Sequence, residues 1–279
     1  ETSILAFVDN DTIVPMVSSK DHKKVFEGEA GLNTGGMGTF SPSEIYTDEL
    51  AKEVQEKIIA ACKRSGRDPQ DVQLLPVSKN HPAADIAELY KAGWNNFGEN
   101  YVQELAKKHD ELPADINWYM IGHLQRNKVK YIADYVTMIQ SVDSLKLMNM
   151  IEKEGRKHDR IIPILIEVNV GEEESKFGVK PTLQDCMELA EASLQLPHVK
   201  LRGLMTSAPY YDDPEKTRPI FRQLRELRDE MNNQNDQLKL DVLSMGMTHD
   251  YEIAVEEGST CVRVGTAIFG PRDYSNRQY

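Results

Sequence analysis

The stretch VQLLPVSKNHP, from Val72 to Pro82, sets the fold of this chain. Its apolar first half has the length and composition of a buried strand of about five or six residues. Lys79 follows at the carboxyl end of that strand, and Pro82 then opens a helix. In a sheet built from alternating strands and helices, ligands bind at the carboxyl ends of the strands. Lys79 is therefore a candidate ligand-binding residue.

The same alternation continues to the end of the chain. Helical stripes separate further apolar runs, such as Leu183, Met187, Ala190 and Leu194 between two of them. The predicted strands after the first are Asn95–Asn100, Asn117–Gly122, Tyr135–Ser141, Ile161–Val170, Val199–Met205, Leu238–Met245 and Thr260–Val264. Eight strands with a helix after each predict an α/β fold of the (β/α)8 TIM-like barrel type. The alternative is an open doubly wound sheet, which usually has fewer strands.

Composition restricts the class of protein. The 279 residues are 40% hydrophobic and 28% charged, enough for one barrel domain. A net charge of -12 disfavours nucleic acid as a partner, because its binding requires clustered Lys and Arg. No apolar run is long enough to span a membrane, and no secretory leader begins the chain. Cys62, Cys186 and Cys261 lie far apart, which predicts neither disulfides nor zinc and fits a cytoplasmic location.

The first fifty residues differ from the rest. Nine acidic residues and three lysines give them half of the excess negative charge. Thr2–Val8 and Thr12–Met16 are typical of two strands joined by a hairpin turn. The Gly-rich stretch Ser18–Pro42 resembles part of the ATP-grasp domain of phosphoribosylamine-glycine ligase. Nothing later in the chain resembles the nucleotide and metal sites of such a ligase, so we expect no ligase activity.

We accordingly divide the chain into an ATP-grasp-like fragment, residues 1–50, and a barrel, residues 51–279. A helix connects them. Thr47 is the predicted N-cap, and Gly66 is the predicted stop. Between them Val54, Ile58 and Cys62 recur every four residues and predict a buried face.

Two loops near the end of the chain suggest an anion site. In a barrel, phosphates commonly bind in the loops after strands seven and eight, which here are Ser244–Asp250 and Gly265–Gly270. Both offer glycine amides and hydroxyls, with a helix close behind. Lys79, after strand one, would neighbour strand eight around the closed circle. Arg263 would project inward nearby, where it could lower the pKa of an amine or meet a ring nitrogen. An amine beside phosphate-sized turns suggests a phosphorylated aldehyde as ligand.

Other interpretations of these residues remain open. Arg263 could instead pair with a core carboxylate such as Glu167. Ser207, His249 and Asp250 could form a hydrolase triad, although no G-x-S-x-G elbow is present. His123 is either a residue near the pocket mouth or a buried, satisfied histidine. The charged helix surface around Arg222 is most simply a solvated face with intrahelical pairs.

Seven motifs in order resemble the pyridoxal phosphate homeostasis proteins of the YggS/PROSC type. They are PVSKNHP, FGENYVQE, WYMIGHLQRNK, SKFG, LRGLM, LSMGMTHD and VRVGTAIFGPRDY, and the resemblance as a whole covers about residues 52–274. The resemblance implies a barrel like the amino-terminal domain of alanine racemase. It also implies pyridoxal 5'-phosphate (PLP) held as a Schiff base.

The resemblance assigns roles to individual residues. The lysine of the Schiff base is Lys79, and Arg263 faces the pyridine nitrogen. Asn100 lies near the cofactor ring. The phosphate-binding residues are Ser244, Gly246, Met247, Thr248, Gly265 and Thr266. The family often has serine where this chain has Thr248, which keeps the hydroxyl, and no member known to us carries the ligase-like segment.

Three functions follow as expectations. The first is a cytoplasmic, monomeric PLP carrier that takes part in PLP homeostasis, with PLP-dependent apoenzymes as partners and little or no catalysis. The second is a PLP-dependent amino-acid racemase. Racemisation needs proton donors on both faces of the cofactor, and the chain stops at Tyr279, which leaves no room for the domain that supplies the opposing base. The third is an ATP-dependent ligase of purine biosynthesis.

Overall fold

The computed structural model describes residues 2–3, 6–8, 13–15, 19–21, 39–40, 44–171, 173 and 176–270. Eight of its strands form a single parallel sheet in the spatial order β6-β13-β12-β11-β10-β9-β8-β7. These strands are β6 (Gln73–Pro76), β7 (Asn96–Glu99), β8 (Asn117–Met120), β9 (Met138–Val142), β10 (Ile162–Glu167), β11 (Val199–Met205), β12 (Val242–Ser244) and β13 (Cys261–Val264). The predicted parallel barrel is confirmed.

The first and last strands of this order meet and close the barrel. Val77, directly after β6, forms a parallel bridge with Gly98 of β7. The Ser78 amide donates to the Gly98 carbonyl at 3.1 Å. The closed circle makes β6 a neighbour of both β7 and β13, so residues that follow these three strands share one edge.

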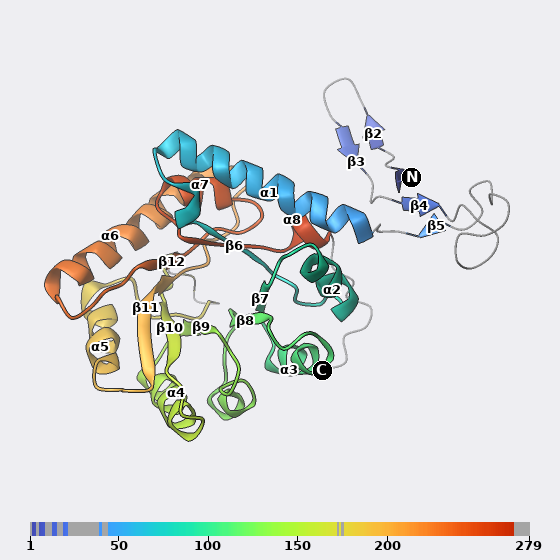
Figure 1. Ribbon diagram of the computed structural model, residues 1–279. Coiled ribbons are helices and arrows are strands. Elements are labelled where there is room, and N and C mark those ends of the chain that lie inside the picture. Colours follow the sequence, from blue (N-terminus) through green and yellow to red (C-terminus); the bar gives the residue numbers. More distant parts are fainter. Residues whose placement is uncertain are drawn as a thin grey trace.

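Helices surround the sheet on its outside (Figure 1). The α-helices are α1 (Glu44–Ser65), α2 (Ala83–Lys91), α3 (Val102–Glu111), α4 (Leu145–Lys157), α5 (Leu183–Ser193), α6 (Arg218–Gln234), α7 (Tyr251–Glu256) and α8 (Thr266–Phe269). Short 3-10 turns are η1 (Pro69–Asp71), η2 (Arg126–Tyr131) and η3 (Pro214–Thr217). In the described part of the chain, no helix has the length and apolar character needed to cross a membrane.

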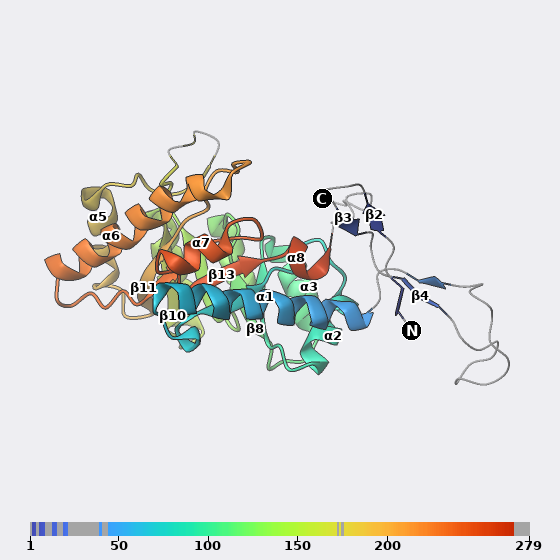
Figure 2. The same cartoon turned by 90° about the horizontal axis from the view of Figure 1, so that it is seen from above.

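The helix α1 differs from its prediction at one end. It begins at Glu44 rather than with Thr47 as N-cap, and it ends before Gly66, whose φ of +70° suits a helix stop. Val54, Ile58 and Cys62 are buried as predicted. Figure 2 shows α1 running alongside α7 and α8.

Two apolar cores hold the barrel. The larger one lies between the sheet and the helices, and its largest fully buried side chain is Trp118. The smaller one fills the centre of the barrel and consists of Leu75, Tyr119, Met138, Leu165, Met205 and Cys261. Gly203 in β11 allows a close strand approach, since a Cβ there would lie 1.8 Å from the Val242 carbonyl oxygen.

Short strands also occur before residue 44. They are β1 (Thr2–Ser3), β2 (Ala6–Val8), β3 (Ile13–Pro15), β4 (Ser19–Asp21) and β5 (Thr39–Phe40). β2 pairs antiparallel with β3, as the predicted hairpin requires. The predicted turn at residues 9–11 and the glycine-rich loop lie outside the described residues. The division at residue 50 stays a prediction and falls inside α1.

Candidate functional site at the carboxyl ends of the strands

The pairing of β6 with β13 determines the place of Lys79. The Val77 amide donates to the Val264 carbonyl at 2.8 Å, so the chain after β6 runs beside the chain after β13. Lys79 follows Val77 by two residues, and Gly265 follows Val264 by one. The partly exposed Lys79 and the Gly265 turn therefore leave neighbouring strands at the same edge of the barrel.

The two predicted phosphate turns contact each other. The Arg263 amide donates to the Gly246 carbonyl at 2.9 Å, and the Ala267 amide lies 3.4 Å from the Thr248 hydroxyl oxygen. Gly246 has a φ of +96°, and a Cβ there would come within 2.5 Å of Ala254 Cβ in α7. Only glycine meets both conditions. The structure thus holds the turns after β12 and β13 together.

Three amides of these turns have no acceptor in the part of the chain that the structure describes. Among the described residues, nothing accepts the amide protons of Gly246, Gly265 or Thr266. Met247 differs from the other predicted phosphate ligands, because its amide donates to the Asp250 carboxylate at 2.7 Å. Free amides converging on one small region are typical of an anion site.

Arg263 is a buried cation whose close partners are neutral. Its guanidinium donates to Ser244 Oγ at 2.6 Å and to the Thr206 carbonyl at 2.7 Å, with Ser207 Oγ at 3.3 Å. The side chain is 4% exposed, and this burial lowers the pKa of Arg263. In the described part of the chain, no carboxylate lies within ion-pair distance of it. The alternative ion pair with Glu167 is therefore wrong.

Ser244 connects Arg263 to the barrel interior. Its hydroxyl donates to Gln140 Oε1 at 2.7 Å, and the Gln140 amide nitrogen lies 3.8 Å from Cys261 Sγ. All of these side chains are buried. This chain of contacts fixes the guanidinium and leaves Ser244 engaged on two sides. Gln140 could not be predicted as part of the site, because nothing in an apolar strand marks a glutamine as belonging to a network with Arg263.

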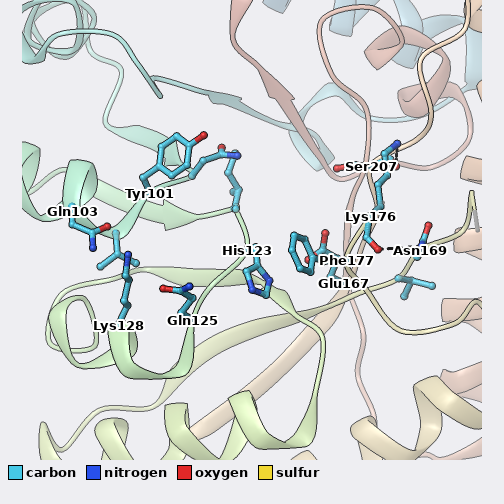
Figure 3. Close-up of a pocket in the computed structure, with 15 residues that line it drawn as sticks. Tyr101, Gln103, His123, Gln125, Lys128, Glu167, Asn169, Lys176, Phe177 and Ser207 are labelled. Carbon is cyan, nitrogen blue, oxygen red and sulfur yellow. Dashed lines mark hydrogen bonds between the residues drawn. The ribbon is translucent and has the colours of Figure 1, made fainter. Parts of the chain in front are cut away.

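A cavity of about 510 Å³ opens at the same end of the barrel (Figure 3). Asn100, Glu167 and Ser207 line it, and Asn100 Oδ1 and Glu167 Oε2 are buried atoms without a protein partner among the described residues. Burial raises the pKa of Glu167 to about 7, although the charge of Arg263 opposes this shift. Lys79 and the phosphate turns are not among the residues that line this cavity.

Two further histidine interpretations are settled by contacts. His123 lines the cavity and stacks on Phe177 with ring centroids 3.7 Å apart, so it lies at the mouth (Figure 3). The hydrolase triad is wrong. His249 stacks on Tyr210 and contacts the Tyr211 carbonyl at 2.9 Å, while the Ser207 hydroxyl is a partner of Arg263.

The donor set fits a phosphorylated pyridine aldehyde. Free amides near Gly246 and Gly265 suit a phosphate, Arg263 suits an uncharged ring nitrogen, and Lys79 suits an aldehyde. Asn100 Oδ1 and Glu167 Oε2 leave polar atoms available for ring substituents. The arrangement supports binding with a covalent amine contact.

Comparisons with known proteins agree with this geometry. The family model described as alanine racemase, N-terminal domain, matches residues 54–273. A second model, phosphoribosylglycinamide synthetase, ATP-grasp (A) domain, matches residues 1–65 only.

Curated relatives include a protein from Aquifex aeolicus, named pyridoxal phosphate homeostasis protein, that is 48% identical over 81% of this chain and 98% of its own length. A Haemophilus influenzae protein of the same name is 38% identical over 81% of this chain and 95% of its own length.

Solved structures show the same likeness. PipY of Synechococcus elongatus, solved with PLP bound, is 39% identical, with a TM-score of 0.67 over 78% of this chain and all of PipY. Alanine racemase of Clostridium difficile, at 15% identity and a TM-score of 0.61 over 83% of this chain and 59% of its own, shares the fold. The chain therefore belongs to the family of the alanine racemase N-terminal domain and, within it, to the pyridoxal phosphate homeostasis proteins.

Proposed function

We propose that this chain binds PLP through Lys79 and serves in PLP homeostasis as a carrier. The main supporting observation is the pairing of β6 with β13, which sets Lys79 beside turns in which three amides, those of Gly246, Gly265 and Thr266, have no acceptor among the described residues. PLP supplies an aldehyde that condenses with an amine and releases water. The relatives named for PLP homeostasis and the PLP-bound PipY support this assignment.

The residues around Lys79 have separate roles in binding PLP. The amides of Gly246, Gly265 and Thr266 bind the phosphate, and the Thr248 hydroxyl keeps the two turns together. Met247 contributes backbone shape, since its own amide is taken by Asp250. Ser244 fixes Arg263. Asn100, whose buried Oδ1 has no partner among the described residues, would lie near the ring.

Arg263 favours storage over turnover. A guanidinium donates hydrogen bonds and keeps its proton, so a ring nitrogen that faces it stays unprotonated. Enzymes that use PLP as an electron sink commonly place an acidic group at that nitrogen. Ser244 and the Thr206 carbonyl accept only some of the N–H groups of Arg263, so other N–H groups of its guanidinium can donate to the ligand. Negligible racemase or transaminase turnover with common amino acids is the expected result, and robust turnover would refute the carrier role.

Borohydride reduction followed by peptide mapping tests the lysine. We expect PLP fixed to the peptide that contains Lys79, and loss of this label in Lys79→Arg. Lys153→Arg, on an exposed position of α4, is the matched control and should label as the wild type does. Label on another lysine of the wild type, or no label after addition of PLP, would contradict the proposal.

A further inference from the structure

A buried cluster of charges lies next to the turn that carries Lys79. Lys108 of α3 is 4% exposed, and its ammonium donates to Glu99 Oε1 at 2.7 Å and to Glu104 Oε1 at 2.8 Å. The same ammonium donates to the Ser78 carbonyl at 2.7 Å. One buried cation thus connects β7, α3 and the residue that precedes Lys79.

The two carboxylates hold the chain on both sides of Lys79. The Ser78 hydroxyl donates to Glu99 Oε1 at 2.6 Å, and the Asn80 amide donates to Glu104 Oε1 at 2.7 Å. Asn80 has a φ of +62°, the left-handed region that side chains other than glycine adopt at a cost. The hydrogen bond that the Asn80 amide donates to Glu104 offsets that cost and keeps the turn in this conformation.

Stability alone does not explain this cluster. Burying charges carries a desolvation cost that one ion pair repays only with good geometry, and apolar replacements are often neutral or stabilising. The cost is visible at Glu99, where burial raises the pKa to about 7 despite Lys108, and where Oε2 has no partner among the described residues. In the described part of the chain, every hydrogen bond that the side chains of this cluster make to backbone goes to Ser78 or Asn80.

We propose that Glu99, Glu104 and Lys108 are positioning residues that fix the Lys79 turn before PLP arrives. The inference rests on the proposed role of Lys79. A group held in its reacting place avoids the entropic cost of being ordered during the reaction, and small displacements are costly. The phosphate turns are held separately, through Gly246, Arg263 and Thr248. The cluster should therefore control covalent attachment and leave phosphate binding alone.

Two ligands separate these effects. PLP reports covalent attachment, measured as the rate at which borohydride-stable label appears on Lys79. Pyridoxine 5'-phosphate carries an alcohol in place of the aldehyde and reports noncovalent binding only. In Glu104→Ala we expect attachment slowed about tenfold or more. Affinity for pyridoxine 5'-phosphate should stay within about twofold of the wild type. Glu104→Gln keeps an acceptor oxygen for Asn80 and should recover most of the rate.

Glu152→Ala is the matched control. Glu152 of α4 is also a helix glutamate whose carboxylate accepts a hydrogen bond from a backbone amide, that of His198 at 2.7 Å. His198 directly precedes β11, so this contact lies at the opposite end of the barrel from Lys79. The Glu152→Ala variant should have a lower melting temperature and an unchanged rate of PLP attachment to Lys79. An unchanged attachment rate in Glu104→Ala, or an equal loss for both ligands, would overturn the inference alone. Absence of label on Lys79 in the wild type would overturn the proposed function and this inference with it.

Discussion

The Glu257 cluster among the outer helices and the Arg263 site at the carboxyl edge of the barrel treat buried charge in opposite ways. Between α6 and α7, Glu257 is 4% exposed and accepts hydrogen bonds from three arginines, Arg218 at 3.2 Å, Arg222 at 2.8 Å and Arg225 at 3.2 Å. At the carboxyl edge, and among the described residues, Arg263 contacts neutral oxygens only and Glu167 keeps a buried oxygen without a partner.

The difference separates charges that pair with one another from charged groups that keep unused hydrogen-bonding capacity. A buried polar atom without a partner is unfavourable, so a fold tolerates it where function requires it. The Glu257 cluster is complete and should contribute to stability. Arg263 and Glu167 keep unused hydrogen-bonding groups, and we expect them to contribute little to the free energy of unfolding.

The largest expected effect comes from breaking the complete cluster. Glu257→Ala leaves three arginines without their shared carboxylate, and we expect a loss of about 2–4 kcal/mol in the free energy of unfolding, measured with urea. PLP binding should not change. Glu230→Ala, on an exposed position of α6, is the control and should cost less than about 0.5 kcal/mol. A Glu257→Ala variant as stable as the control would contradict the comparison.

Burial of the Glu167 carboxylate should make the free energy of unfolding depend on pH. Because the pKa of Glu167 is raised to about 7 in the folded protein, its contribution is fully present below pH 4.5 and is lost as pH rises through 7. We expect Glu167→Gln to remove about 1–3 kcal/mol of this decline, measured by urea unfolding of the PLP-free protein at several pH values. If the free energy of unfolding changed with pH in the same way for variant and wild type, Glu167 would be exposed to water rather than buried.

Replacing Arg263 should affect the ligand more than the fold. We expect Arg263→Met to change the free energy of unfolding of the PLP-free protein by less than about 1 kcal/mol, because the lost hydrogen bonds and the relieved desolvation oppose each other. The absorption spectrum of bound PLP should change in Arg263→Glu while some cofactor is retained. A spectrum identical to the wild type would place Arg263 away from the ring.

The smallest effect is expected from the amino-terminal segment. Deletion of residues 1–45 should leave PLP binding unchanged, because all strands of the barrel begin after residue 70. The full chain should show no glycine-dependent ATP hydrolysis with phosphoribosylamine. Hydrolysis clearly above a control without protein would show that this segment has an activity of its own.

The barrel could be predicted because its signals are local. Each strand is a short apolar run, and each helix has its own stripe, so Ile162–Glu167 and Leu183–Ser193 follow from a few neighbouring residues. Boundaries were less certain. The predicted strand Leu238–Met245 is only Val242–Ser244, although Leu238 and Leu240 are buried.

Partners across the fold could not be predicted in the same way. The charged face of α6 around Arg222 was expected to carry intrahelical pairs, yet Arg222 and Arg225 reach Glu257 after α7. Sequence spacing shows which residues share a helix face and does not show what packs against it. Lys108 was missed for this reason, since its partner Glu99 lies on a strand.

The barrel closes between β6 and β7 through a short junction, which we call the seam. β6 and β7 meet through one bridged pair, Val77 with Gly98, whereas β10 and β11 share a long ladder. Lys79 follows β6 and Asn100 follows β7, so a ligand attached to Lys79 and in contact with Asn100 would connect these two strands across the seam. Amide hydrogen exchange at Val77 and Ser78 should therefore slow on PLP binding more than exchange in β10.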